Sequence, residues 1–245
     1  MTVTPDNVIE GAVLHTWGGY VHGGTKAYRG RAGNYAKLLR ATVFVPDYRQ
    51  APESPFPIPI DDTFLAYRSL SESGVPPQTL VIAGDAAGGA MVVTIMREAK
   101  EANIALPAAA VAMSTWADLT HSGDAAKVIN GIDPLCSAEF LNQLAGIFLA
   151  GDLPIHPDAS PNFADVRGLA PTLIQIGENE VMLSGATRLA AHLGDSRVRT
   201  SLEIWPGMFH VWPLFAGLLL EADQALRNAV RFLDDALSSS PHEIR

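Results

Sequence analysis

Short apolar and β-branched runs alternate along the chain with longer segments of helical periodicity. The apolar runs lack an alternation of apolar and polar positions, which is typical of strands buried on both faces of a parallel sheet. They predict six strands, at residues 11–16, 41–48, 79–85, 109–115, 171–177 and 200–207. Helical spacing predicts helices at 31–40, 61–73, 88–104, 137–150, 184–194 and 213–237. This order predicts an α/β fold with an open, mostly parallel sheet and helices on both faces.

Length and charge narrow the class of protein. The 245 residues, 48% of them hydrophobic, are enough for one sizeable core, so we expect a single domain over residues 1–245. A formal net charge of −9 excludes the basic footprint that nucleic acid or an anionic membrane requires. The single cysteine, Cys136, excludes an internal disulfide and a cysteine-based zinc site, and it favours the cytoplasm.

Neither a membrane span nor a cofactor is expected. The longest apolar stretch is interrupted by His210 and Pro213 and is shorter than the ~20 residues that cross a bilayer. The polar N-terminus has no secretory signal pattern. His15 and His22 lack a third ligand at metal-binding spacing, and no phosphate-binding glycine motif is present. We therefore expect no metal and no cofactor.

The functional residues of an open α/β sheet lie at the carboxyl ends of its strands. The first predicted strand is followed by HTWGGYVHGG, in which Gly18 and Gly19 leave their backbone N–H groups approachable. Such groups suit an oxyanion hole, whose donors must lie about 3 Å from the developing charge. The alternative is an ordinary glycine-rich turn.

The third predicted strand runs into IAGDAAGGAMVV, residues 82–93. This is the frame of the G-x-S-x-G nucleophile elbow, a strained strand-to-helix turn that exposes a serine. Its central residue here is Ala86, and the N–H of Ala87 would lie at a helix N-terminus, where an anion is favoured. Close packing of a strand on a helix is the alternative explanation for the small residues.

A candidate acid and base follow later in the chain. His210 lies on a loop among apolar residues, which suits a general base, and Glu180 ends the preceding strand, where it could orient the imidazole. Taken alone, each could be an ordinary surface carboxylate or loop histidine. The order elbow, acid, histidine is, however, the order of α/β-hydrolases.

These segments resemble the bacterial hormone-sensitive-lipase-like esterases of the α/β-hydrolase fold. The resemblance runs from about residue 12 to residue 235 and includes DYRQAPESPFPIPIDD at 47–62, IAGDAAGG at 82–89 and WPGMFHVW at 205–212. The family's His-Gly-Gly-Gly motif falls on residues 16–19, where only Gly18 and Gly19 match; His15 is displaced by one position. The family's N-terminal cap is expected to be shortened or absent.

The resemblance assigns roles to individual residues. The nucleophile position falls on Ala86, the acid on Glu180 and the base on His210, while Gly18, Gly19 and Ala87 would donate to the oxyanion. It implies a serine-type carboxylic-ester hydrolase for small esters, either short-acyl or aromatic. Candidate pocket residues are Tyr20, Met208, Phe209 and Trp212.

Alanine at position 86 closes the acyl-enzyme route, so the chain is expected to be nearly inactive. Because acid, base and glycines are all present, we favour an engineered replacement of serine over a natural pseudoenzyme or small-ligand receptor. An amidase or a lactonase with the same triad stays open. The last strand and the helix at 213–237 would form a sheet edge, which favours a homodimer.

Overall fold

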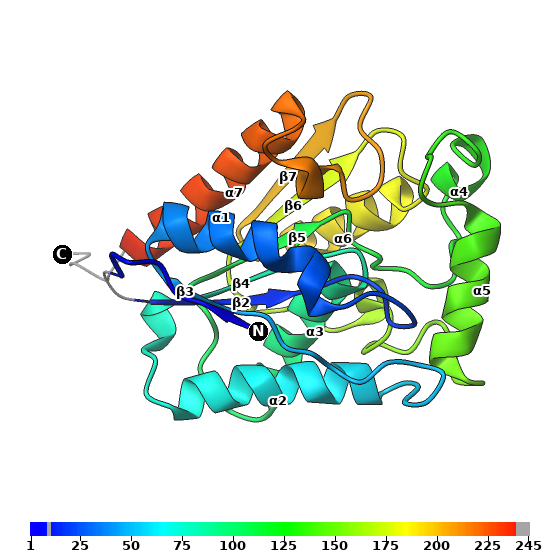
Figure 1. Ribbon diagram of the computed structural model, residues 1–245. Helices are drawn as coiled ribbons and strands as arrows, with labels where there is room; N and C mark the ends of the chain where they lie inside the picture. Colours follow the sequence, from blue (N-terminus) through cyan, green and yellow to red (C-terminus); the bar gives the residue numbers. More distant parts are fainter. Residues whose placement is uncertain (9–10, 239–245) are drawn as a thin grey trace.

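The protein is described by a computed structural model that covers residues 1–8 and 11–238. Seven strands form one sheet in the order β1-β3-β2-β4-β5-β6-β7 (Figure 1). Within these residues only the pairing of β1 with β3 is antiparallel, and every other pair is parallel. The strands are β1 (Thr2–Val3), β2 (Ala12–Thr16), β3 (Thr42–Phe44), β4 (Leu80–Asp85), β5 (Ala109–Met113), β6 (Thr172–Gly177) and β7 (Thr200–Trp205).

Helices cover both faces of this sheet, as Figure 1 shows. One face carries α1 (Arg29–Leu39) and α7 (Leu220–Ser238). The other carries α3 (Ala87–Glu101), with α2 (Ile58–Glu72) packed against it, and α6 (Leu183–Asp195). Short 3-10 helices lie at Thr25–Tyr28, Pro77–Thr79, Pro161–Phe163 and Trp212–Phe215. The α/β-hydrolase fold expected from the sequence is thereby confirmed.

The connection between β5 and β6 is long and lies beyond the carboxyl ends of the strands. It contains α4 (Ala125–Val128) and α5 (Ala138–Leu149), which stand at that end of the sheet in Figure 1. The strands β2, β4, β5 and β6 are buried at every position. Burial on both faces explains why their sequences lack alternation.

Several boundaries differ from the sequence expectations. The strand at 41–48 ends at Phe44, because Pro46 has no N–H to donate to the ladder. The helix expected at 213–237 is divided into a 3-10 helix at Trp212–Phe215 and α7, with Gly217 between them at φ +92°. That left-handed conformation favours glycine and interrupts a helix. The two-residue β1 carries no recognisable sequence signal.

No helix in residues 1–8 and 11–238 is both long and apolar enough to cross a membrane. No group of three or more His, Cys, Asp or Glu side chains there is arranged to hold a metal ion.

Candidate active site

The turn between β4 and α3 has the backbone of a nucleophile elbow. Ala86 adopts φ 51° and ψ −119°, outside the regions where residues with a side chain ordinarily lie. Its N–H donates to the carbonyl of Met113, and its own carbonyl accepts from Trp116 N–H, both at 3.0 Å. Bonds to the neighbouring β5 segment thus stabilise a strained conformation, which is a feature of functional sites.

Steric crowding explains the small residues of this turn. A Cβ on Gly84 would overlap the Thr16 hydroxyl and the backbone of Gly88. A Cβ on Gly18 would lie 2.6 Å from the Cβ of Ala86, so the loop after β2 approaches the elbow directly. Thr16 stands where the related family has histidine, and its hydroxyl donates to the Gly88 carbonyl at 2.7 Å.

The glycine loop after β2 faces the same point as the elbow. Gly18 N–H donates to the hydroxyl of Tyr28 at 3.2 Å, and that hydroxyl donates to Asp85 Oδ2 at 2.7 Å. Ala87 is the first residue of α3, so its N–H has no acceptor within the helix. Backbone donors from two different elements therefore converge beside residue 86.

Glu180 and His210 form a buried pair beside these donors. Glu180 follows β6, and its Oε1 accepts from Gly177 N–H at 2.6 Å and from the Ser114 hydroxyl at 2.8 Å. Its Oε2 lies 2.9 Å from Nδ1 of His210, which follows β7. Both side chains are buried. A carboxylate held in this way fixes the ring orientation and the tautomer of its histidine.

Burial and hydrogen bonding shift the pKa values of Glu180 and His210 in opposite directions. Burial raises the pKa of Glu180, although the bonds from His210, Gly177 and Ser114 lower it in part. Burial by itself would lower the pKa of His210, but the interactions of its ring with Cys136 and Glu180 outweigh burial and hold that pKa well above its ordinary value. The imidazolium form is therefore stabilised by its neighbours.

One cleft of about 330 Å³ collects these groups. It is lined by Gly18, Gly19, Ala86, Ala87 and His210, which were expected at the site, and Glu180 lies behind His210. The remaining lining is largely apolar and comes mainly from α5 and nearby loops: Trp116, Leu135, Cys136, Phe140, Leu141, Leu144, Met182, Val211 and Leu214, with His22, Gly23, Ala27 and Tyr28 on the glycine-loop side.

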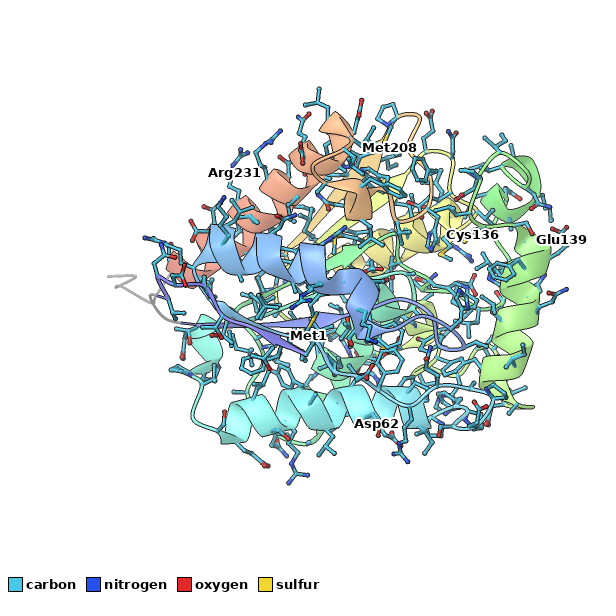
Figure 2. All side chains as sticks on the ribbon, viewed as in Figure 1. Met1, Asp62, Cys136, Glu139, Met208 and Arg231 are labelled. Carbon is cyan, nitrogen blue, oxygen red and sulfur yellow. The ribbon has the colours of Figure 1, made fainter. Side chains whose placement is uncertain are left out.

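The four expected pocket residues, Tyr20, Met208, Phe209 and Trp212, are not among the residues that line this cleft. Tyr20 is buried and stacks on Phe148, with ring centroids 3.7 Å apart. Met208, Phe209 and Trp212 pack in a small cluster of their own next to α7, and Figure 2 labels Met208 on that side. Large apolar side chains near a motif are as useful for packing as for binding.

Residues missed by sequence reasoning lie mostly in the β5–β6 connection. The apolar positions of α5, predicted as a helix but not as a wall, face the cleft through Phe140, Leu141 and Leu144. Asp133 is also buried and accepts from His210 N–H at 3.0 Å. The sequence pattern that could have indicated this wall is the set of three apolar side chains on one predicted helix.

Comparisons with known proteins support the fold and the class of protein. The sequence profile of the α/β hydrolase fold family matches residues 13–214. An acetyl-hydrolase from Streptomyces hygroscopicus is 37% identical over 219 residues, which are 89% of this chain and 73% of that protein. The crystal structure of an esterase from the bacterial hormone-sensitive lipase family has a TM-score of 0.94 at 34% identity, covering 97% of this chain and 80% of that chain.

A second solved structure, the esterase EstE5 soaked with p-nitrophenyl butyrate, has a TM-score of 0.93 at 36% identity and covers 97% of this chain and 81% of that chain. The fold and the matched region define an α/β-hydrolase of the esterase type. The chain belongs to the hormone-sensitive-lipase-like esterases of that family.

Proposed function

We propose that the cleft is the active site of a serine-type carboxylic-ester hydrolase in which residue 86 is the nucleophile position. One observation carries the proposal: a strained elbow at Ala86, backbone donors at Gly18, Gly19 and Ala87, and the imidazole of His210 all line the same cleft. Such convergence is what acyl transfer requires.

Each group would then have a definite role. With serine at position 86, Oγ attacks the ester carbonyl carbon while Nε2 of His210 takes its proton. Glu180, bound to Nδ1, orients the ring and stabilises the imidazolium. The oxyanion is stabilised by the N–H groups of Gly18, Gly19 and Ala87. To donate to it, Gly18 N–H gives up its hydrogen bond to the Tyr28 hydroxyl. The C–O bond breaks, His210 returns the proton to the leaving alcohol, and water hydrolyses the acyl-enzyme by the same steps.

The size and lining of the cleft support small esters as substrates. A volume of about 330 Å³ is at the lower end of the range for ligand sites. The lining offers apolar side chains for a short acyl or aromatic group and no clustered cations for a charged head group. The relative named an acetyl-hydrolase supports the same substrate class.

Alanine at position 86 leaves His210 without a hydroxyl to activate, so we propose that the chain turns over esters very slowly. An engineered change from serine is our preferred explanation, because the acid, base and donors are all in place. A natural binding protein on the same fold is the alternative. An amidase or lactonase would use the same groups, and a panel of esters, anilides and lactones separates these activities.

The test is hydrolysis of p-nitrophenyl acetate and butyrate by the parent chain and by Ala86→Ser. We expect a gain of at least roughly 1,000-fold in kcat/KM, since the nucleophile and its base act as a unit. The rate should rise with pH through a midpoint above the ordinary histidine value, because the raised pKa of His210 keeps the base protonated at lower pH. A folded Ala86→Ser variant without any gain would instead favour the binding protein.

Domain organisation, compartment and oligomeric state belong to the same proposal. The chain acts as a single α/β-hydrolase domain, without metal or cofactor, because the proposed steps need only side-chain and backbone groups. The free thiol of Cys136 supports a reducing, cytoplasmic compartment. A homodimer through β7 is supported by the edge position of that strand.

A further inference from the structure

The cleft contains a second nucleophilic side chain besides the elbow position. Cys136 is the sole cysteine of the sequence and its thiol is free. It lines the same cleft as Ala86, Ala87 and His210, and its side chain is close enough to the ring to help raise the pKa of His210. Figure 2 shows it at the end of the sheet where α4 and α5 lie. A buried structural cysteine without a neighbouring base is inert, whereas Cys136 has the imidazole of His210 as a neighbour.

Asp133 fixes the cysteine segment to the histidine loop. Its Oδ1 accepts from the N–H groups of Leu135 at 2.9 Å and Cys136 at 3.3 Å. Its Oδ2 accepts from His210 N–H at 3.0 Å. This carboxylate is buried, so its bonds are shielded from water. One buried carboxylate therefore holds the backbone of Cys136 and the backbone of His210 next to each other.

The elbow leaves the histidine available to this thiol. His210 is buried and lines the cleft, its Nδ1 is engaged by Glu180, and residue 86 offers only a methyl group. A thiol reacts as its thiolate, which an adjacent imidazole generates by taking the proton. Thiol and imidazole thus line one cleft, with the carboxylate of Glu180 bound to the imidazole.

We propose that Cys136 is an acyl acceptor in this cleft, with His210 as its base and Glu180 as the residue that orients His210. The inference rests on the proposed ester-binding function of the cleft. The Sγ proton passes to Nε2 of His210 while Sγ bonds to the ester carbonyl carbon. The ester C–O bond then breaks, and the proton moves from Nε2 to the departing alcohol. The product is a thioester on Cys136.

Hydrolysis of that thioester would return the thiol. Water attacks the same carbonyl carbon, His210 takes the water proton, the C–S bond breaks and the proton returns to sulfur. With a p-nitrophenyl ester we expect the thioester to accumulate, because p-nitrophenolate is a better leaving group than a thiolate. The chain should therefore be acylated once, quickly, and then turn over slowly.

The test uses p-nitrophenyl acetate and the parent chain. We expect one equivalent of p-nitrophenol in a burst and one acetyl group per chain by intact mass spectrometry. Peptide mapping should place the acetyl on Cys136, and neutral hydroxylamine should remove it. No acetylation, or acetylation of another residue, would overturn the proposal.

Two comparisons separate an activated thiol from a merely accessible one. His210→Gln keeps the cysteine and should be acetylated roughly 100-fold more slowly, the typical contribution of a general base. The parent chain should also react faster when folded than when unfolded in urea, a comparison that needs no variant. Equal rates in either comparison would contradict a role for His210.

The double variant Ala86→Ser, Cys136→Ala distinguishes this inference from the proposed function. If it hydrolyses esters while the parent chain is not acetylated, the inference fails and the function stands. If the parent chain is acetylated on Cys136 but serine at position 86 brings no turnover, the acceptor role is supported and the assignment of residue 86 fails.

Discussion

A buried set of polar side chains lies directly beneath the elbow. Asp85, the last residue of β4, accepts from the Tyr28 hydroxyl and lies 3.4 Å from Nε2 of His15. Tyr28 in turn accepts from Gly18 N–H. The elbow and the glycine loop are therefore joined through side chains, and the position of Gly18 N–H, the proposed oxyanion donor, depends on a tyrosine hydroxyl.

Removing that hydroxyl should destabilise the protein. In Tyr28→Phe the buried carboxylate of Asp85 loses its donor, and we expect the free energy of unfolding to fall by about 1–3 kcal/mol. Urea denaturation measures this. Tyr35→Phe is the matched control, because the Tyr35 hydroxyl is also buried but contacts Met113 Sδ, at 3.8 Å, and Arg31 rather than donating to a carboxylate. Equal losses in both variants would show that the link to Asp85 is not important.

His15 should make stability depend on pH. Burial lowers its pKa, although Asp85 partly offsets this. Below about pH 6.5 the unfolded chain takes up a proton on this residue that the folded chain does not, so the free energy of unfolding falls as pH falls. In His15→Phe, where the ring packs near Tyr28 and Tyr35, the loss of Tm between about pH 7 and 5 should be smaller. An unchanged loss would assign the dependence to other groups.

At the scale of elements, α5 forms much of the wall of the cleft. The helix begins at Ala138 after Ser137, whose hydroxyl accepts from Phe140 N–H, and it ends at Leu149, because the next residue, Ala150, is left-handed. Phe140, Leu141 and Leu144 follow the i, i+1, i+4 spacing of one helix face. The acyl-chain length that the cleft accepts should therefore depend on α5 more than on the loops that follow β2, β4 and β7.

Leu144→Phe tests that dependence in the Ala86→Ser background. The larger ring narrows the cleft, and we expect the ratio of kcat/KM for butyrate over acetate to fall about tenfold, as one or two methylenes lose their space. Steady-state kinetics with the two p-nitrophenyl esters gives the ratio. Ile147→Phe is the control, since Ile147 lies on the same helix, is 41% exposed and does not line the cleft. A shift in both variants would mean that α5 acts indirectly.

The sequence predicted the elements in which an apolar pattern along the chain corresponds to burial in the fold. Continuous burial gave β4 and β6 a clear apolar signature, and the elbow frame at 84–89 located the turn. Local patterns did not locate the pocket residues, because the apolar character of Trp212 is the same in a packed cluster as in a binding site. The links from Asp133 and Tyr28 join segments distant in sequence, so only the folded chain reveals them.

At the scale of the whole molecule, strand order assembles the site. β2 and β4 are neighbours, so the glycine loop lies beside the elbow, and β6 and β7 are neighbours, so Glu180 meets His210. All four are parallel, which places their following loops at one end of the sheet. Groups more than 100 residues apart in the chain thereby share one cleft.

The same order leaves β7 as a sheet edge. An edge strand presents unpaired backbone groups on which another strand can pair. On β7 the side chains of Leu202 and Ile204 are 39% and 47% exposed and, two residues apart, share one face. An apolar exposed edge of this kind favours association of two copies.

We therefore expect a concentration-dependent homodimer that Leu202→Lys together with Ile204→Lys converts to monomer. The added charges would have to be buried in the interface, which costs several kcal/mol unless they are paired. Sedimentation velocity at several concentrations measures the state of both proteins. Leu65→Lys on α2 is the control, because Leu65 is 59% exposed and lies away from β7. A parent chain that sediments as a monomer at every concentration would contradict this expectation and would show that the twist and side chains of β7 already protect the edge. The proposed active-site cleft would then be complete within one chain.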